Sequence, residues 1–194
     1  LRSGRLVIPC DHADAGSRQW FSHIIYSDDH GANWTLGGVA GPKCNECQVI
    51  ERADGSLLLN MRSYRGGNRR LVAASTDGGL TFTEPVKDDA LIEPVCQASI
   101  LRLTNAPAGT LLFANPASTK REKMTVRLSR DDGRTWPLAR EICAGSAAYC
   151  CLVELPEKSI GCFYETDGYN RIAYARFPLS WLEQAAPNFA TPVN

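Results

Sequence analysis

The sequence has little of several features that define common protein classes. Its 194 residues carry no net charge, because 21 Lys plus Arg balance 21 Asp plus Glu. A balanced chain has no general attraction for nucleic acid or anionic membranes, so we expect neither as a partner. No apolar run approaches the ~18 residues that a spanning helix needs, and we expect no membrane span. Histidine is scarce, with three residues, and we expect no metal or cofactor.

Cysteine is present eight times, but disulfide scaffolds are usually shorter and denser in cysteine. Cys44 and Cys47 form one C-x-x-C pair, and no second pair follows at zinc-finger spacing. We therefore expect free thiols that behave as small apolar residues, and the redox compartment stays open. The chain begins Leu1-Arg2-Ser3-Gly4, which is neither an initiator Met nor a signal peptide, so we expect it to open in mid-protein.

What the sequence does contain is a repeated octet, Ser-x-Asp-x-Gly-x-Thr-aromatic, with Asn in place of Thr in the first copy. The copies occupy residues 27–34, 75–82 and 129–136, so their starts lie 48 and 54 residues apart. Glycine tolerates positive φ, and Asp and Ser bond nearby amides, which is turn chemistry. Aspartate clusters also suggest calcium, but we interpret the octets as structural turns. Three copies at similar spacing indicate a repeated β unit.

Short β-branched segments alternate with turns between the octets. In the second unit, residues 48–50 and 57–59 flank an Asp54-Gly55 hairpin turn. Each unit therefore contains four antiparallel strands in ~50 residues, which is typical of a β-propeller blade. We predict an all-β propeller of about three and a half blades, with further blades upstream. The predicted blades are residues 1–40, 41–90, 91–143 and 144–185, followed by a tail at 186–194.

Antiparallel order predicts that the octet turns lie at one rim of the blades and that the reactive side chains lie at the other. An arginine fork binds a carboxylate bidentately. A Glu can take the proton of a Tyr, whose phenol is otherwise a poor nucleophile because its pKa is ~10. These residue types predict a site for an anionic substrate. The residues at that rim are Glu46, Arg62, Gln97, Arg121, Tyr149 and Glu165.

Several residues near this rim have alternative interpretations. Gln97 either contacts substrate or has a structural role. Arg127 competes with Arg121, but it lies inside a strand, and we expect it to make a packing or surface contact. Cys150-Cys151 lacks a nearby His to act as base, so we do not expect a cysteine nucleophile. Three aromatic residues remain open as pocket-lining side chains: Trp20, Phe21 and Tyr64.

These linked motifs resemble the sialidase (neuraminidase) family over essentially the whole chain. The octets are similar to the family's Asp boxes, and residues 45–49 with 59–63 resemble its segment carrying a Glu and the second arginine. Residues 120–122 resemble the segment of the third arginine, and residues 146–149 resemble that of the nucleophilic Tyr. The final blade of the family is similar to residues 163–165, 172–175 and 179–182.

The resemblance implies a six-bladed propeller that hydrolyses terminal sialic acids of glycoproteins, glycolipids or oligosaccharides with retention of configuration. It implies that Tyr149 is the nucleophile and Glu46 its base. Arg62 and Arg121 would bind the sugar carboxylate, with Gln97 as a further candidate contact, and Glu165 would orient an arginine. Sialidases are the tyrosine exception among glycosidases. A neutral tyrosine avoids the repulsion that the sugar's own carboxylate would exert on an anionic nucleophile.

Two parts of the family's site are not recognisable: the arginine of an Arg-Ile-Pro motif and the Asp acid/base of an early loop. Residues 4–9 are more similar to a later strand, and we expect neither Asp11 nor Asp14 to be the acid. We therefore expect about two blades to be missing and the 194 residues alone to be inactive. The resemblance also implies an extracellular or periplasmic location. A non-catalytic sialic-acid-binding propeller and a protein-interaction propeller stay open as alternatives.

Overall fold

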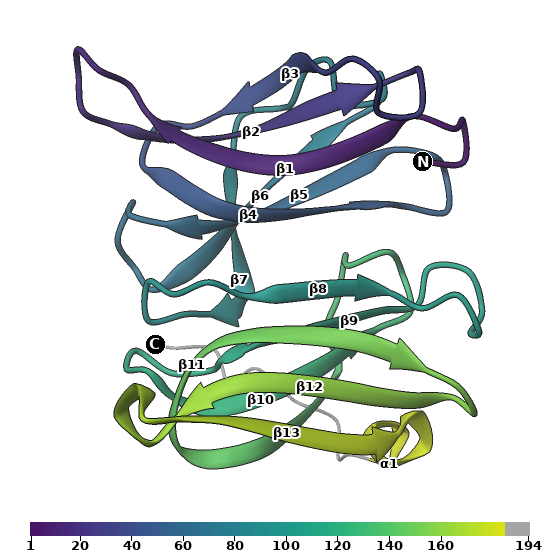
Figure 1. Ribbon diagram of the computed structural model, residues 1–194. Coiled ribbons are helices and arrows are strands. Elements are labelled where there is room, and N and C mark those ends of the chain that lie inside the picture. The colour runs from purple at the N-terminus through teal and green to yellow at the C-terminus, as the bar shows by residue number, and fades with distance from the viewer. Residues whose placement is uncertain (185–194) are drawn as a thin grey trace. The chain divides into compact units, whose positions relative to one another are not determined.

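The computed structural model describes residues 1–184, which form almost entirely antiparallel strands (Figure 1). The predicted tail at 186–194 lies outside the described residues. The chain divides into two compact units, one of residues 1–89 and one beginning at Ala90. No helix in the described part of the chain is long and apolar enough to cross a membrane.

The first unit contains a three-stranded sheet, and a four-stranded sheet comes after it in the chain. Within each sheet, neighbouring strands are also consecutive in the sequence. The strands of the first sheet are β1 (Leu6–Ala13), β2 (Trp20–Ser27) and β3 (Thr35–Ala40). Those of the second are β4 (Cys44–Glu51), β5 (Leu57–Ser63), β6 (Arg69–Ser75) and β7 (Val86–Ile92), of which β7 runs across the unit boundary. Alternate apolar residues of these strands form one core, in which Ile24, Leu59, Met61 and Leu71 are almost fully buried.

The second unit contains six strands in sequence order, again all antiparallel (Figure 1). They are β8 (Ser99–Arg102), β9 (Leu111–Pro116), β10 (Glu122–Ser129), β11 (Leu138–Leu155), β12 (Ser159–Thr166) and β13 (Arg171–Pro178). A short turn of 3₁₀ type, η1 (Asp167–Tyr169), joins β12 to β13, and helix α1 (Leu179–Glu183) follows. The core of this second unit contains Leu112, Met124 and Leu182.

The long strand β11 runs without interruption through residue 143, where the sequence predicted a boundary between two blades. Its first half pairs with β10 and its second half pairs with β12, so one strand serves both neighbours. The segment around Ser146 stays extended, and groups on both sides form hydrogen bonds with its backbone. Ala147 N–H donates to the Arg121 carbonyl, and the Thr166 hydroxyl donates to the Ser146 carbonyl. The blade limits themselves stay predictions.

The three octets share one hydrogen-bond pattern. In each copy the Ser hydroxyl donates to the Asp carboxylate at 2.7 Å and accepts the Gly N–H at 2.8–2.9 Å. The same carboxylate accepts the backbone N–H four residues further on, at 2.8, 3.0 and 2.9 Å in chain order. These carboxylates belong to Asp29, Asp77 and Asp131. The octets are turns stabilised by hydrogen bonds among their own residues, as the turn chemistry predicted.

The octet glycine also allows the two sheets of the first unit to approach each other. Gly79 has a φ of +91°, and a Cβ added there would lie 2.3 Å from Cδ1 of the buried Ile24. Its carbonyl accepts the N–H of Gly38, on β3, at 2.7 Å. Only glycine fits both the backbone conformation and the available space.

Candidate active site

Glu46 lies at an irregularity between β4 and β5. Two residues of β4, Asn45 and Glu46, stand opposite Arg62 alone. Such a β-bulge bends the strand and changes the direction of its side chains. Arg62 Nη1 donates to Glu46 Oε2 at 2.7 Å, and the guanidinium carbon lies 5.2 Å from the centre of the Tyr64 ring. The structure thus brings together Glu46 and Arg62, with Tyr64 beside them.

The two aspartates considered as acids are both exposed, but their pKa values shift in opposite directions. Asp14 accepts the N–H and hydroxyl of Ser17, and these bonds lower the pKa of its carboxyl. Partial desolvation raises the pKa of Asp11, and the nearby Glu46 raises it further. A general acid must keep its proton near the working pH, so Asp11 is the better matched of the two. The prediction that the acid lies outside this chain stays a prediction.

Arg5 lies in the segment that superficially suggests the family's first arginine. Its guanidinium binds both carboxylate oxygens of Asp28, at 2.7 and 2.8 Å, and donates to the Gly78 carbonyl at 3.0 Å. Arg5 therefore connects the first two octets. This arrangement agrees with the interpretation of residues 4–9 as the start of a later strand.

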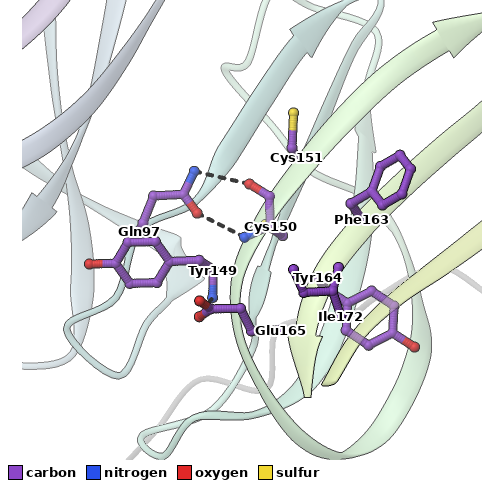
Figure 2. A pocket seen from close by; sticks show the side chains of 8 residues that line it. All are labelled: Gln97, Tyr149, Cys150, Cys151, Phe163, Tyr164, Glu165 and Ile172. Atoms are coloured by element: carbon purple, nitrogen blue, oxygen red, sulfur yellow. Dashed lines mark hydrogen bonds between the residues drawn. The ribbon is translucent and has the colours of Figure 1, made fainter. Parts of the chain in front are cut away.

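Tyr149 lies at a matching irregularity between β11 and β12. Here Ala148 and Tyr149 stand opposite Glu165 alone. Glu165 Oε2 accepts the backbone N–H of Tyr149 at 3.2 Å. Gln97 Oε1 accepts the Cys150 N–H at 2.9 Å, and its Nε2 donates to the Cys150 carbonyl at 3.0 Å (Figure 2). Side chains thus provide hydrogen-bond partners for the backbone at and just after Tyr149.

These bonds bear on two of the predicted roles. The Gln97 amide is engaged with the backbone on both sides, which favours its structural role over substrate contact. The Glu165 carboxylate binds the main chain of Tyr149, and its predicted role in orienting an arginine stays a prediction. Gln97, Tyr149 and Glu165 nonetheless come together, as the strand order predicted.

Arg121 lies beside the same tyrosine. Its Nη1 donates to the Tyr169 hydroxyl at 2.7 Å, and its Nη2 donates to the Val95 carbonyl at 3.3 Å. The guanidinium carbon is 5.8 Å from the Tyr149 ring centre and 5.9 Å from that of Tyr169. Arg127, in contrast, is buried and donates to Asn115 Oδ1 at 3.1 Å, so it packs in the core as expected.

A pocket of about 280 Å³ opens next to Tyr149 and Glu165 (Figure 2). Its walls are almost wholly apolar and include Phe163, Tyr164 and Ile172. Phe163 and Ile172 are exposed to solvent over 48% and 76% of their surface. The described surface therefore offers an apolar wall directly beside the candidate nucleophile.

The cysteines are free thiols, as predicted. Burial raises the pKa of Cys47 to about 12, and its thiol donates to the Cys10 carbonyl at 3.3 Å. Cys150 is buried, and its thiol donates to the Ala114 carbonyl at 3.1 Å. Within residues 1–184, no group of three or more His, Cys, Asp or Glu side chains is arranged to hold a metal ion.

The sequence interpretation missed three side chains near the candidate residues. Tyr169 binds Arg121, and the sequence signal was the Asp167-Gly168 turn, which predicts a bend but not the direction of the phenol. His12 and His23 approach each other with 3.0 Å between their Nδ1 atoms, and His12 stacks on Phe21. The histidines are diagonal neighbours across β1 and β2, so only the strand register could have revealed them.

Comparison with known proteins agrees with this fold. The family model of the BNR repeat-like domain matches residues 1–162. The sialidase of Micromonospora viridifaciens is 41% identical over 175 residues, which cover 87% of this chain and 27% of the relative. The sialidase of Bacteroides fragilis is 35% identical and matches 86% of this chain and 32% of its own length. The chain belongs to the sialidase family of BNR-repeat proteins.

Solved structures show the same relationship. The Hadza microbial sialidase Hz136 superposes with a TM-score of 0.84 at 33% identity, covering 94% of this chain and 36% of that one. A Trypanosoma rangeli sialidase in complex with sialic acid superposes with a TM-score of 0.69 at 25% identity, covering 90% and 29%. The prediction of a partial sialidase-type β-propeller is confirmed. The chain spans about a quarter to a third of the length of the two bacterial relatives.

Proposed function

We propose that the protein containing this chain is an exo-α-sialidase, which hydrolyses terminal sialic acids of glycoconjugates with retention of configuration. The related proteins named as sialidases support this activity. The observation that carries the proposal is the position of the Arg121 guanidinium, 5.8 Å from the ring centre of Tyr149. A carboxylate bound at Arg121 therefore lies close to the tyrosine that would attack the neighbouring carbon.

Substrate binding depends on the charge of sialic acid. Arg62 and Arg121 bind its carboxylate, because a guanidinium offers paired N–H donors that match the two carboxylate oxygens. The two arginines lie in different units, so their convergence rests on the relationship to sialidases. The exposed apolar side chains of Phe163 and Ile172 border the pocket beside Tyr149 and offer a surface for the uncharged parts of the substrate.

The reaction proceeds in two displacements. The Tyr149 oxygen attacks the anomeric carbon while Glu46 takes the phenolic proton, and the glycosidic C–O bond breaks. The leaving oxygen receives a proton from a general acid that this proposal does not assign to the chain. Water then attacks the same carbon and gives one proton to the conjugate base of that general acid, while the bond to Tyr149 breaks and its oxygen recovers a proton from Glu46. Because Glu46 and Tyr149 lie in different units, their pairing rests on the relationship to sialidases.

The stereochemistry of release tests this proposal. The full-length protein is mixed with a simple α-sialoside, and the first anomer of free sialic acid is identified by ¹H NMR. Two displacements give the α-anomer first, and release of the β-anomer first contradicts a tyrosine nucleophile. Binding of the sialoside without any cleavage supports instead the alternative of a non-catalytic sialic-acid-binding propeller.

A further inference from the structure

We propose that Tyr169 and the Val95 carbonyl form a cradle that orients Arg121 to receive a carboxylate, with Tyr169 acting as a positioning residue. This inference rests on the proposed function. The cradle holds the guanidinium from two directions, because Nη1 donates to the Tyr169 hydroxyl and Nη2 to the Val95 carbonyl. A guanidinium fixed in this way presents its fork with less loss of side-chain entropy on binding.

Both hydrogen-bond acceptors of the cradle lie on unusual backbone. Val95 has a φ of +54°, which is a genuine outlier for a β-branched residue. Tyr169 has a φ of +72° and follows Asp167 at +52° and Gly168 at +60°, so three consecutive residues adopt the left-handed region. Such conformations persist only where the surrounding structure enforces them, and they cluster at ligand sites. The backbone is strained on both sides of the same arginine.

The turn that carries Tyr169 is fixed to the strand that carries Tyr149. Gly168 N–H donates to Ser146 Oγ at 3.0 Å, and the Thr166 hydroxyl donates to the Ser146 carbonyl at 2.6 Å. The next residue, Ala147, donates its N–H to the Arg121 carbonyl at 2.9 Å. The main chain of Arg121 and the turn of Tyr169 are therefore both anchored just before the β11 bulge. This common anchor sets the position of the guanidinium relative to Tyr149.

The exposure of Tyr169 makes its role separable from packing. The side chain is 58% exposed, so loss of its hydroxyl removes the bond to Arg121 and leaves the core intact. Tyr174 on β13 offers a matched control, because it is 48% exposed and packs its ring on Phe163 with 4.6 Å between centroids. The same Tyr→Phe change at the two positions isolates the contact with the guanidinium.

The test measures binding of sialic acid and of its C1 methyl ester to full-length wild type, Tyr169→Phe and Tyr174→Phe, by equilibrium titration. Tyr169→Phe is expected to weaken binding of the acid by up to about tenfold, because the freed Arg121 side chain must then be ordered when the ligand binds. The ester lacks the negative charge and is expected to lose much less. Tyr174→Phe is expected to match wild type for both ligands, and the thermal midpoints of all three proteins should agree.

Equal weakening of acid and ester, or wild-type binding of the acid by Tyr169→Phe, would overturn the cradle. Absence of acid binding to wild type would overturn it as well. Kinetics separate this outcome from failure of the proposed function. A wild type that binds the acid but cleaves no sialoside contradicts the enzyme and still tests the cradle. In an active enzyme, Tyr169→Phe should raise KM with kcat nearly unchanged, because the contact is made in ground and transition states alike.

Discussion

The two units contain the same backbone device with different side chains. In β4 the bulge places Glu46 opposite Arg62, and the two side chains bind each other at 2.7 Å. In β11 the bulge places Tyr149 opposite Glu165, and there the carboxylate binds the backbone N–H of the tyrosine. The first arrangement orients the side chain of Glu46, and the second fixes the main chain at Tyr149. The two bulges thus supply equivalent positions, and the residue types decide whether a position carries the proposed base, Glu46, or the proposed nucleophile, Tyr149.

The largest expected effect comes from removing the proposed nucleophile in the β11 bulge. Tyr149→Phe keeps the ring but loses the phenol oxygen, so kcat of the full-length enzyme should fall by roughly 10³-fold or more, as expected for a covalent nucleophile that acts as a unit with its base. Steady-state hydrolysis of a fluorogenic sialoside measures the change. Tyr174→Phe, on β13 and outside the lining of this pocket, is the matched control and should keep wild-type turnover. Turnover of Tyr149→Phe within tenfold of wild type would show that Tyr149 is not the nucleophile.

Replacing each bulge carboxylate by its amide sharpens the comparison between the two units. Glu46→Gln cannot accept the phenolic proton, and loss of a general base lowers kcat by about 10²–10⁴-fold. Glu165→Gln retains an oxygen that can accept the Tyr149 N–H, so we expect a smaller loss of kcat than for Glu46→Gln. The two variants are compared by the same assay at pH 5 to 8. Equal losses would remove the distinction between base and backbone support.

Gln97 provides a test by stability rather than by rate. Gln97→Ala leaves the N–H and carbonyl of Cys150 without the amide, at a cost of about 2 kcal/mol in the free energy of unfolding. Gln97→Glu keeps an acceptor for the N–H but loses the donor to the carbonyl, so it should be intermediate at neutral pH. Urea denaturation of the full-length protein measures both. An alanine variant as stable as wild type would favour the substrate contact that the sequence left open.

The octet carboxylates give the smallest effect and one that depends on pH. Hydrogen bonds from the Asn33 backbone N–H, the Ser27 hydroxyl and the Asn33 side chain lower the pKa of Asp29 to about 2. A carboxyl with a depressed pKa in the folded state stabilises the fold above its unfolded pKa of ~4 and loses that contribution as the pH falls toward 2. The denaturation midpoint should therefore drop between pH 4 and pH 2.

Asp29→Asn is the control for this pH dependence, because the amide cannot titrate. Its denaturation midpoint should change less than that of wild type over the same range. An identical pH dependence in the two proteins would show that the octet carboxylate is not the source.

The local features of this chain could be predicted from the sequence, and the features set by strand register could not. Each octet turn depends on residues within eight positions, so its chemistry could be predicted. The spacing of the octets and the β-branched segments between them then predicted antiparallel blades. The β11 bulge depends on the pairing of residues far apart in the sequence, and the predicted blade boundary at residues 143–144 falls inside this continuous strand. The cradle on Arg121 requires left-handed backbone at Tyr169, which a tyrosine does not predict. The general acid, the blade limits and an extracellular or periplasmic location stay predictions.

The central claim, that Tyr149 is the nucleophile, is tested most directly by trapping the covalent intermediate. With 2,3-difluorosialic acid, the tyrosine oxygen displaces the C2 fluoride, and the C3 fluorine slows the hydrolysis that follows. The full-length enzyme is incubated with this reagent, digested, and mapped by mass spectrometry. We predict that the sialyl adduct lies on the peptide carrying Tyr149 and is absent in Tyr149→Phe. An adduct on Glu46 or another carboxylate, or an active enzyme that forms no adduct, would contradict the account.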